Sequence, residues 1–212
     1  MALAAVLAGL RMLLKSADSG GKIIAYSQNP DWQTGCESVS LYILLRYYRV
    51  DVTVRDIVDV LPREPMPFEE DGILYGGNPE RGFVGSPSDP NSYGVLNEPI
   101  AAAANLFLGG AVAESGLDTD DVEEILGEGI PLIVWVSMYP DREPKITCWT
   151  DAETGEEVTW IGGEHAVVVY GVDKSGFKVS DPKTGTLGVI SKDDFSAGFE
   201  RHGGRVVYYP KQ

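Results

Sequence analysis

The stretch Gln28-Asn-Pro-Asp-Trp-Gln-Thr-Gly-Cys36-Glu-Ser-Val-Ser40 marks the change from a loop to a helix in the first half of the chain. Pro30 lacks a backbone donor and disfavours helix at the residue before it, and Gly35 permits a close backbone approach. From Val39 to Tyr48 the sequence is dense in apolar side chains, which predicts a helix buried on more than one side. We therefore expect Cys36 in the first turn of a buried helix.

A cysteine at a helix start is well placed for chemistry. Unpaired N–H groups and the positive end of the helix dipole stabilise a thiolate, which is the nucleophilic form. The competing interpretation is a small buried apolar residue, the usual state of a free cysteine. The stretch alone leaves the two balanced, because the reactivity of Cys36 depends on partners elsewhere in the chain.

Length and charge restrict the classes of protein. The 212 residues suit one domain, and 43% hydrophobic with 23% charged residues allows a sizeable core. The net charge of −15, with no local cluster of lysine and arginine, repels phosphate backbones and anionic lipid surfaces. We expect no nucleic-acid partner and no stable membrane insertion, and the sequence leaves the oligomeric state open.

The cysteine count excludes a disulfide framework. Cys36 and Cys148 could form one bridge, which would remove Cys36 as a nucleophile. They could also join His165 and His202 as four zinc ligands, but the short paired spacings of structural zinc sites are missing. We therefore expect no metal and no cofactor.

The first residues, Met1 to Leu10, are small and apolar without a preceding basic region, and the run is too short to span a bilayer. We assign residues 1–21 as an N-terminal apolar segment or the remnant of a signal or anchor, and 22–212 as one domain. The compartment stays open between the cell envelope or exterior and the cytoplasm.

Helical patterns come first and strand patterns second, which predicts an α+β fold. Thr53 and Asp118 are expected helix N-caps, and Asn97 a third. The segment Pro62–Tyr93 holds six prolines and five glycines and reads as a long loop, either a lid or a passive surface excursion. Expected strands are a short one at 22–26, a buried one at 130–138, the hairpins 146–150/157–161 and 166–171/177–180, and two more at 187–190 and 205–209.

The second hairpin places two candidate site residues together. His165 opens one strand and Asp181 ends the other, so pairing of the strands would make the two side chains neighbours. An aspartate can hold an imidazole in one tautomer and stabilise its cation. Taken singly, His165 reads as a structural histidine and Asp181 as a turn residue before Pro182. His202 lies in a polar, turn-like setting and is expected to be solvated.

The chain order of cysteine, histidine and aspartate is that of a papain-type hydrolase. The sequence also resembles the bacteriocin-processing-like papain-fold cysteine peptidases, bacterial relatives of the double-glycine leader peptidases, from about Gln28 onward. The resemblance rests on four motifs: Gln28 with Thr34-Gly-Cys-Glu-Ser-Val-Ser40, then Gly129-Ile-Pro-Leu-Ile-Val-Trp-Val136, Glu164-His-Ala-Val-Val-Val-Tyr-Gly171 and Ser180-Asp-Pro182.

The resemblance implies a papain-like fold and assigns a role to four residues. Cys36 would be the nucleophile, His165 the general base and acid, Asp181 the residue that orients the imidazole, and Gln28 the oxyanion donor. Gln33 stands where relatives usually carry proline, which leaves a second glutamine close to the cysteine. No transporter segment is present in the sequence, so an exported leader peptide is not implied.

The function expected on this basis is hydrolysis of peptide or amide bonds in a peptide or protein substrate. A papain-fold protein that binds peptides or cell-wall material without turnover is the alternative. A redox role for Cys36 and Cys148 is the weakest, because no Cys-x-x-Cys spacing occurs. Glu37 would raise the pKa of a neighbouring thiol, and its place in the first helical turn is the simpler explanation for it.

Overall fold

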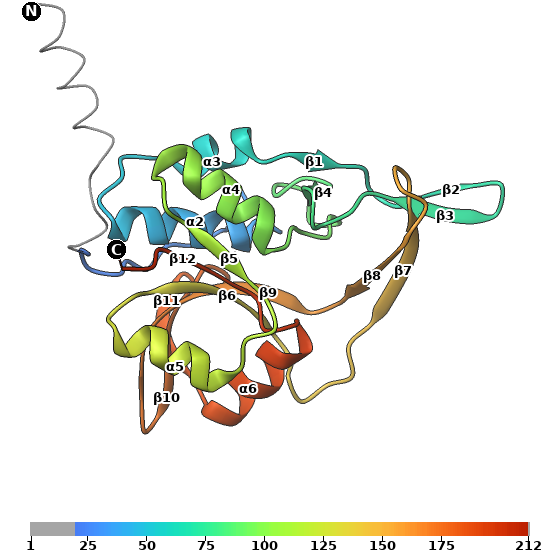
Figure 1. Cartoon of the computed structure of the whole chain (residues 1–212). Helices are drawn as coiled ribbons and strands as arrows, with labels where there is room; N and C mark the ends of the chain where they lie inside the picture. The colour runs from blue at the N-terminus through green and yellow to red at the C-terminus, as the bar shows by residue number, and fades with distance from the viewer. Residues whose placement is uncertain (1–19, 212) are drawn as a thin grey trace, which may run out of the picture.

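A six-stranded antiparallel sheet lies at the centre of the computed structural model, which describes residues 20–211 (Figure 1). Its strand order is β11-β10-β9-β6-β12-β5. Helices α2, α3 and α4 lie on one side of this sheet, and α5 and α6 lie on the other (Figure 1). The helices are α2 (Cys36–Tyr47), α3 (Val54–Val60), α4 (Asn97–Phe107), α5 (Thr119–Gly127) and α6 (Lys192–Arg201). The strands of the central sheet are β5 (Val112–Glu114), β6 (Leu132–Ser137), β9 (Glu164–Asp173), β10 (Gly176–Asp181), β11 (Thr186–Ile190) and β12 (Val206–Tyr208).

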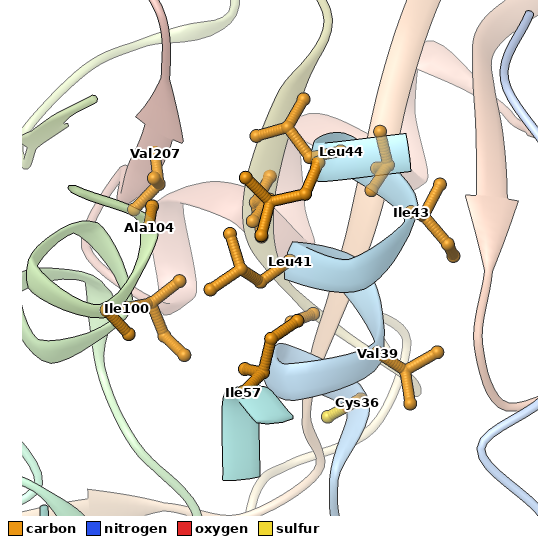
Figure 2. Packing of buried hydrophobic residues seen from close by; sticks show 14 of the residues in the cluster. Cys36, Val39, Leu41, Ile43, Leu44, Ile57, Ile100, Ala104 and Val207 are labelled. Carbon is orange, nitrogen blue, oxygen red and sulfur yellow. The ribbon is translucent and has the colours of Figure 1, made fainter. Parts of the chain in front are cut away.

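Helix α2 is buried on more than one side, as its sequence predicts. Its apolar side chains pack with α3, α4 and the strands beneath (Figure 2). On β9, Ala166 and Val168 belong to this α2 side of the sheet, whereas Val167 and Val169 pack with α6 on the other side. The strand therefore carries two rows of side chains that serve two separate cores.

Two of the three expected helix caps are present. Thr53 and Asp118 each form a reciprocal capping box with the residue three positions later. The prediction for Asn97 is wrong, because α4 has Leu96 as its N-cap. The Asn97 amide instead donates to the Glu114 carbonyl oxygen at 2.8 Å, which ties α4 to β5.

The segment Pro62–Tyr93 is not the long loop that its prolines and glycines predicted. It contains β1 (Arg63–Glu64), β2 (Phe68–Glu70), β3 (Ile73–Gly76) and β4 (Phe83–Val84). The strands β2 and β3 join β7 (Ile146–Asp151) and β8 (Glu157–Ile161) in a second sheet of order β2-β3-β7-β8. This sheet, which we call the arm, extends away from the helices (Figure 1).

The strand predictions for the second half hold for both hairpins and for the buried strand, whereas residues 22–26 form no strand. The helix α6 and the strand β5 were not expected from the sequence. The expected N-terminal segment 1–21 lies almost entirely outside the described residues. Within the described part of the chain, no helix is both long enough and apolar enough to cross a membrane.

Candidate active site

Cys36 is the first residue of α2 and is 6% exposed. The loop before it turns tightly, with the Gly35 N–H donating to the Trp32 carbonyl oxygen at 2.9 Å. A Cβ at Gly35 would lie 3.0 Å from the Trp32 and Pro87 side chains, so glycine permits the close packing of this turn. The Thr34 N–H donates to the Pro87 carbonyl oxygen at 3.0 Å. The Pro- and Gly-rich segment therefore borders the start of α2.

His165 and Asp181 lie together at the ends of β9 and β10. Their Nε2 and Oδ1 atoms are 2.7 Å apart, and Asp181 also accepts from the Lys183 N–H and the Thr184 hydroxyl. Burial opposes ionisation of this carboxyl, but the hydrogen bond and charge of His165 outweigh it and lower the pKa of Asp181 to about 2. The neighbourhood that the hairpin predicted is thus present.

A cavity of about 820 Å³ opens beside this pair on the side of the sheet away from α2. Its lining includes His165, Asp181, the 136–141 segment after β6, and side chains of β11. Lys183 and Thr184 also line it. The imidazole therefore borders a space large enough for part of an extended peptide.

The Cys36 thiol faces different partners. Its Sγ lies 3.4 Å from Glu37 Oε2, and across residues 20–211 no hydrogen bond joins it to His165. Burial first, then the charges of Glu37 and Glu164, raise the pKa of the thiol well above its usual range, and the Ala166 backbone acts weakly in the opposite direction. The sulfur thus lies next to the backbone of Ala166. The His165 imidazole belongs to the opposite row of β9 side chains, on the side of Val167.

A second carboxyl group completes the surroundings of the thiol. The Cys36 sulfur and one carboxyl oxygen each from Glu37 and Glu164 lie within 4.8 Å of one another. Burial raises the pKa of Glu37 to about 7, against the opposing hydrogen bond from the Val95 N–H. Burial and the charge of Glu37 raise the pKa of Glu164 well above its usual range. The sequence held one signal for this cluster, because a glutamate adjoins each of the residues Cys36 and His165.

Gln28 lies between the two groups. It is 3% exposed, and its Nε2 donates to the Gln33 carbonyl oxygen at 2.8 Å. Its backbone N–H donates to the Pro182 carbonyl oxygen at 2.9 Å, directly after Asp181. The side chain of Gln33 is exposed. Of the two glutamines, only Gln28 is therefore buried in the site.

The remaining candidates lie outside this site. Both cysteines are free, and Cys148 is exposed on the arm. The expectation that His202 is solvated is wrong, because it is 7% exposed behind α6. Burial, with the nearby charges of Arg201 and Arg205, lowers the pKa of His202 to about 4.

Residues 22–206 match the Peptidase_C39 like family. The chain belongs to this family. Over 203 residues it is 27% identical to the uncharacterized protein YvpB of Bacillus subtilis (strain 168), covering 93% of this chain and 78% of that protein.

Two solved structures share the fold. A Bacillus anthracis protein named for its likeness to C39 peptidases superposes with a TM-score of 0.77 at 23% identity, covering 90% of this chain and 96% of that one. A double glycine motif protease from an AMS/PCAT transporter, solved in complex with its leader peptide, superposes with a TM-score of 0.50 at 14% identity, covering 92% and 97%. The fold is α+β and papain-like, with the cysteine at a helix start.

Proposed function

We propose that the protein is a cysteine peptidase in which Cys36, His165 and Asp181 act as a triad and Gln28 as an oxyanion donor. The observation that carries the proposal is the His165–Asp181 hydrogen bond of 2.7 Å, in a chain whose buried Cys36 begins a helix. Membership of the Peptidase_C39 like family supports the same chemistry.

The hydrogen bond to Asp181 fixes the direction of proton transfer. It occupies His165 Nε2 and so leaves Nδ1 as the acceptor for the thiol proton. Because the thiol rests against Glu37 and the imidazole lies in the other row of β9 side chains, the Cys36 side chain and the His165 ring both have to move toward each other before attack. The resulting thiolate attacks the substrate carbonyl carbon, and His165 returns the proton to the leaving amine. Water then hydrolyses the thioester.

Two N–H groups would hold the oxyanion. The Cys36 backbone N–H has no acceptor within its helix, because the residue is the first of α2. The Gln28 amide uses one hydrogen on the Gln33 carbonyl oxygen, which leaves its second hydrogen to donate. The cavity beside His165 would hold the peptide on one side of the bond that is cut.

Covalent trapping tests the proposal. The protein is treated with an electrophilic peptide probe, such as a peptidyl acyloxymethyl ketone, and the intact mass and modified residue are determined. We expect one adduct on Cys36 in wild type and in Cys148→Ser, none on that position in Cys36→Ala, and loss of peptide hydrolysis in Cys36→Ala only. Hydrolysis that survives in Cys36→Ala would refute the proposal.

Peptide binding without turnover is the second candidate. It is favoured by the resting contact of the thiol with Glu37, which keeps Cys36 protonated and away from His165. Under this alternative, peptides bind wild type and Cys36→Ala equally, and neither protein cleaves them.

A further inference from the structure

The peptidase mechanism leaves two carboxyl groups without a role, one fully buried and one half-buried. Glu37 from α2 accepts from the Cys36 thiol through Oε2 and from the Val95 N–H, at 2.8 Å, through Oε1. Glu164 from β9 approaches the same place, and its Oε1 is buried with no hydrogen-bond partner among the described residues. Such an orphaned acceptor is costly when charged and much less so when it carries a proton.

The fold makes room for this pair. A Cβ on Gly94 would lie 2.5 Å from Glu37 Oε1 and 3.4 Å from Glu164 Oε2. Any other residue at this position would therefore push into the Glu37 carboxyl group. Trp160 of β8 closes the same side, because the Cβ would lie 2.9 Å from its ring. Gly94 and the Trp160 ring thus pack against the pair.

Positive groups nearby are committed elsewhere. Glu164 lines a second cavity of about 210 Å³ together with Arg201, Arg205, His202 and Glu200. Arg205 forms an ion pair with Glu80 at 2.7 Å, and the Arg201 guanidinium donates to backbone carbonyl oxygens of the 139–142 segment. His202 is neutral above about pH 4. From α2, β9 and β8, the other charged or titratable group that faces the pair is the Cys36 thiol itself.

We infer that Glu37 and Glu164 share one proton at neutral pH and act as positioning residues that hold Cys36 in a protonated resting state. The inference rests on Cys36 being the nucleophile of the proposed peptidase. Two carboxylates and a thiolate whose atoms lie within 4.8 Å of one another repel strongly when all three are charged.

The Cys36 thiol is released from Glu37 when the Glu37–Glu164 pair takes up a second proton from solvent. Glu37 is then neutral, and the thiol loses the charged acceptor that held it. The thiol and the His165 ring then move together, and the thiol passes its proton to Nδ1, which gives a thiolate and an imidazolium. The site therefore opens at mildly acidic pH and closes as the pair becomes negative.

The rate of Cys36 alkylation by iodoacetamide, measured from pH 5 to pH 9 in the Cys148→Ser background, tests this inference without any peptide substrate. The variants are Glu37→Gln, Glu164→Gln and the double variant, with EDTA present throughout. Glu200→Gln is the matched control, because Glu200 is exposed and lines the second cavity without contacting the thiol. Circular dichroism shows that each variant is folded.

We expect the ratio of the variant rate to the wild-type rate to be near one below pH 6 and to rise to at least tenfold at pH 8. A packing defect would instead change the rate by the same factor at every pH. A ratio that does not depend on pH, with Cys36 reactive, overturns the inference and leaves the proposed nucleophile standing. A Cys36 that stays unreactive in every protein at every pH overturns both. If the double variant unfolds, Glu164→Gln alone decides, because it removes one charge and leaves the thiol's own hydrogen bond to Glu37 in place.

Discussion

Two carboxyl groups at opposite ends of the site show opposite behaviour. The pKa of Asp181 is lowered to about 2 and that of Glu37 is raised to about 7. Asp181 borders the large cavity and accepts from an imidazole, a backbone N–H and a hydroxyl. Glu37 is fully buried and receives one backbone N–H and a weakly donating thiol. The number and charge of the donors, rather than the residue type, decide which group is ionised.

The arm supplies a third case that separates burial from charge. The Asp151 side chain is as inaccessible as that of Glu37, yet its pKa is held below the usual range by Arg81. The Arg81 guanidinium donates to both Asp151 oxygens and to Glu64. A buried carboxylate thus stays charged where a cation faces it, and within residues 20–211 no cation forms an ion pair with Glu37.

The largest expected effect is that of removing Asp181, the ionised carboxyl group. In Asp181→Ala the imidazole loses the acceptor that holds its Nε2 proton, so kcat/KM for a peptide should fall on the order of 10⁴-fold, as when the aspartate of a Ser-His-Asp triad is removed. Asp181→Asn should lose a similar factor, because an amide in this place favours the wrong imidazole tautomer.

Asp141→Asn is the matched control, because Asp141 lines the same cavity and is exposed. Its kcat/KM should stay close to wild type. A loss of less than tenfold in Asp181→Ala would show that the ionised carboxylate does not serve catalysis.

The ion pair between Arg81 and the buried Asp151 should contribute to the free energy of unfolding. Arg81→Met leaves Asp151 charged and buried without its cation, and the free energy of unfolding in urea should fall by about 3–5 kcal/mol. Arg46→Met removes an ion pair with the exposed Asp51 and should cost less than about 1 kcal/mol.

The double variant Arg81→Met/Asp151→Leu removes both charges and should regain most of the stability. If Arg81→Met and Arg46→Met lowered the free energy of unfolding equally, Asp151 would be accessible to water once Arg81 is removed. The comparison of Asp151 with the buried Glu37 would then fail.

The features that sequence predicted are those that local patterns determine. The apolar run after Cys36 gave a buried helix, and alternation with short polar turns gave the hairpin that joins His165 to Asp181. The pairing of Glu37 with Glu164 depends on how α2 crosses β9, which no local pattern encodes.

The failures have two origins. In the Pro- and Gly-rich segment, β2 and β3 form a local hairpin across Asp71-Gly72, a turn signal that the sequence held, whereas β3 also pairs in parallel with β7, far along the chain. His202 follows a helix that was not expected, so its burial behind α6 could not be anticipated from a polar, glycine-rich stretch.

The smallest of the expected effects lies where the two ends of the site meet, at Gln28. Its backbone is tied to Pro182 beside Asp181, and its side chain is tied to the loop that leads to Cys36. Gln28→Ala removes one oxyanion donor and should lower kcat on the order of a hundredfold, while iodoacetamide still labels Cys36 at the wild-type rate. Gln33→Ala is the control: the Gln33 side chain is exposed, and the interaction it offers Gln28 is a backbone carbonyl that the substitution retains. It should change kcat little.

If Gln33→Ala were the more damaging variant, the assignment of the donor would be reversed. If both effects were mild, backbone N–H groups at the start of α2 would hold the oxyanion alone, and Gln28 would serve only to join the ionised and the protonated ends of the site.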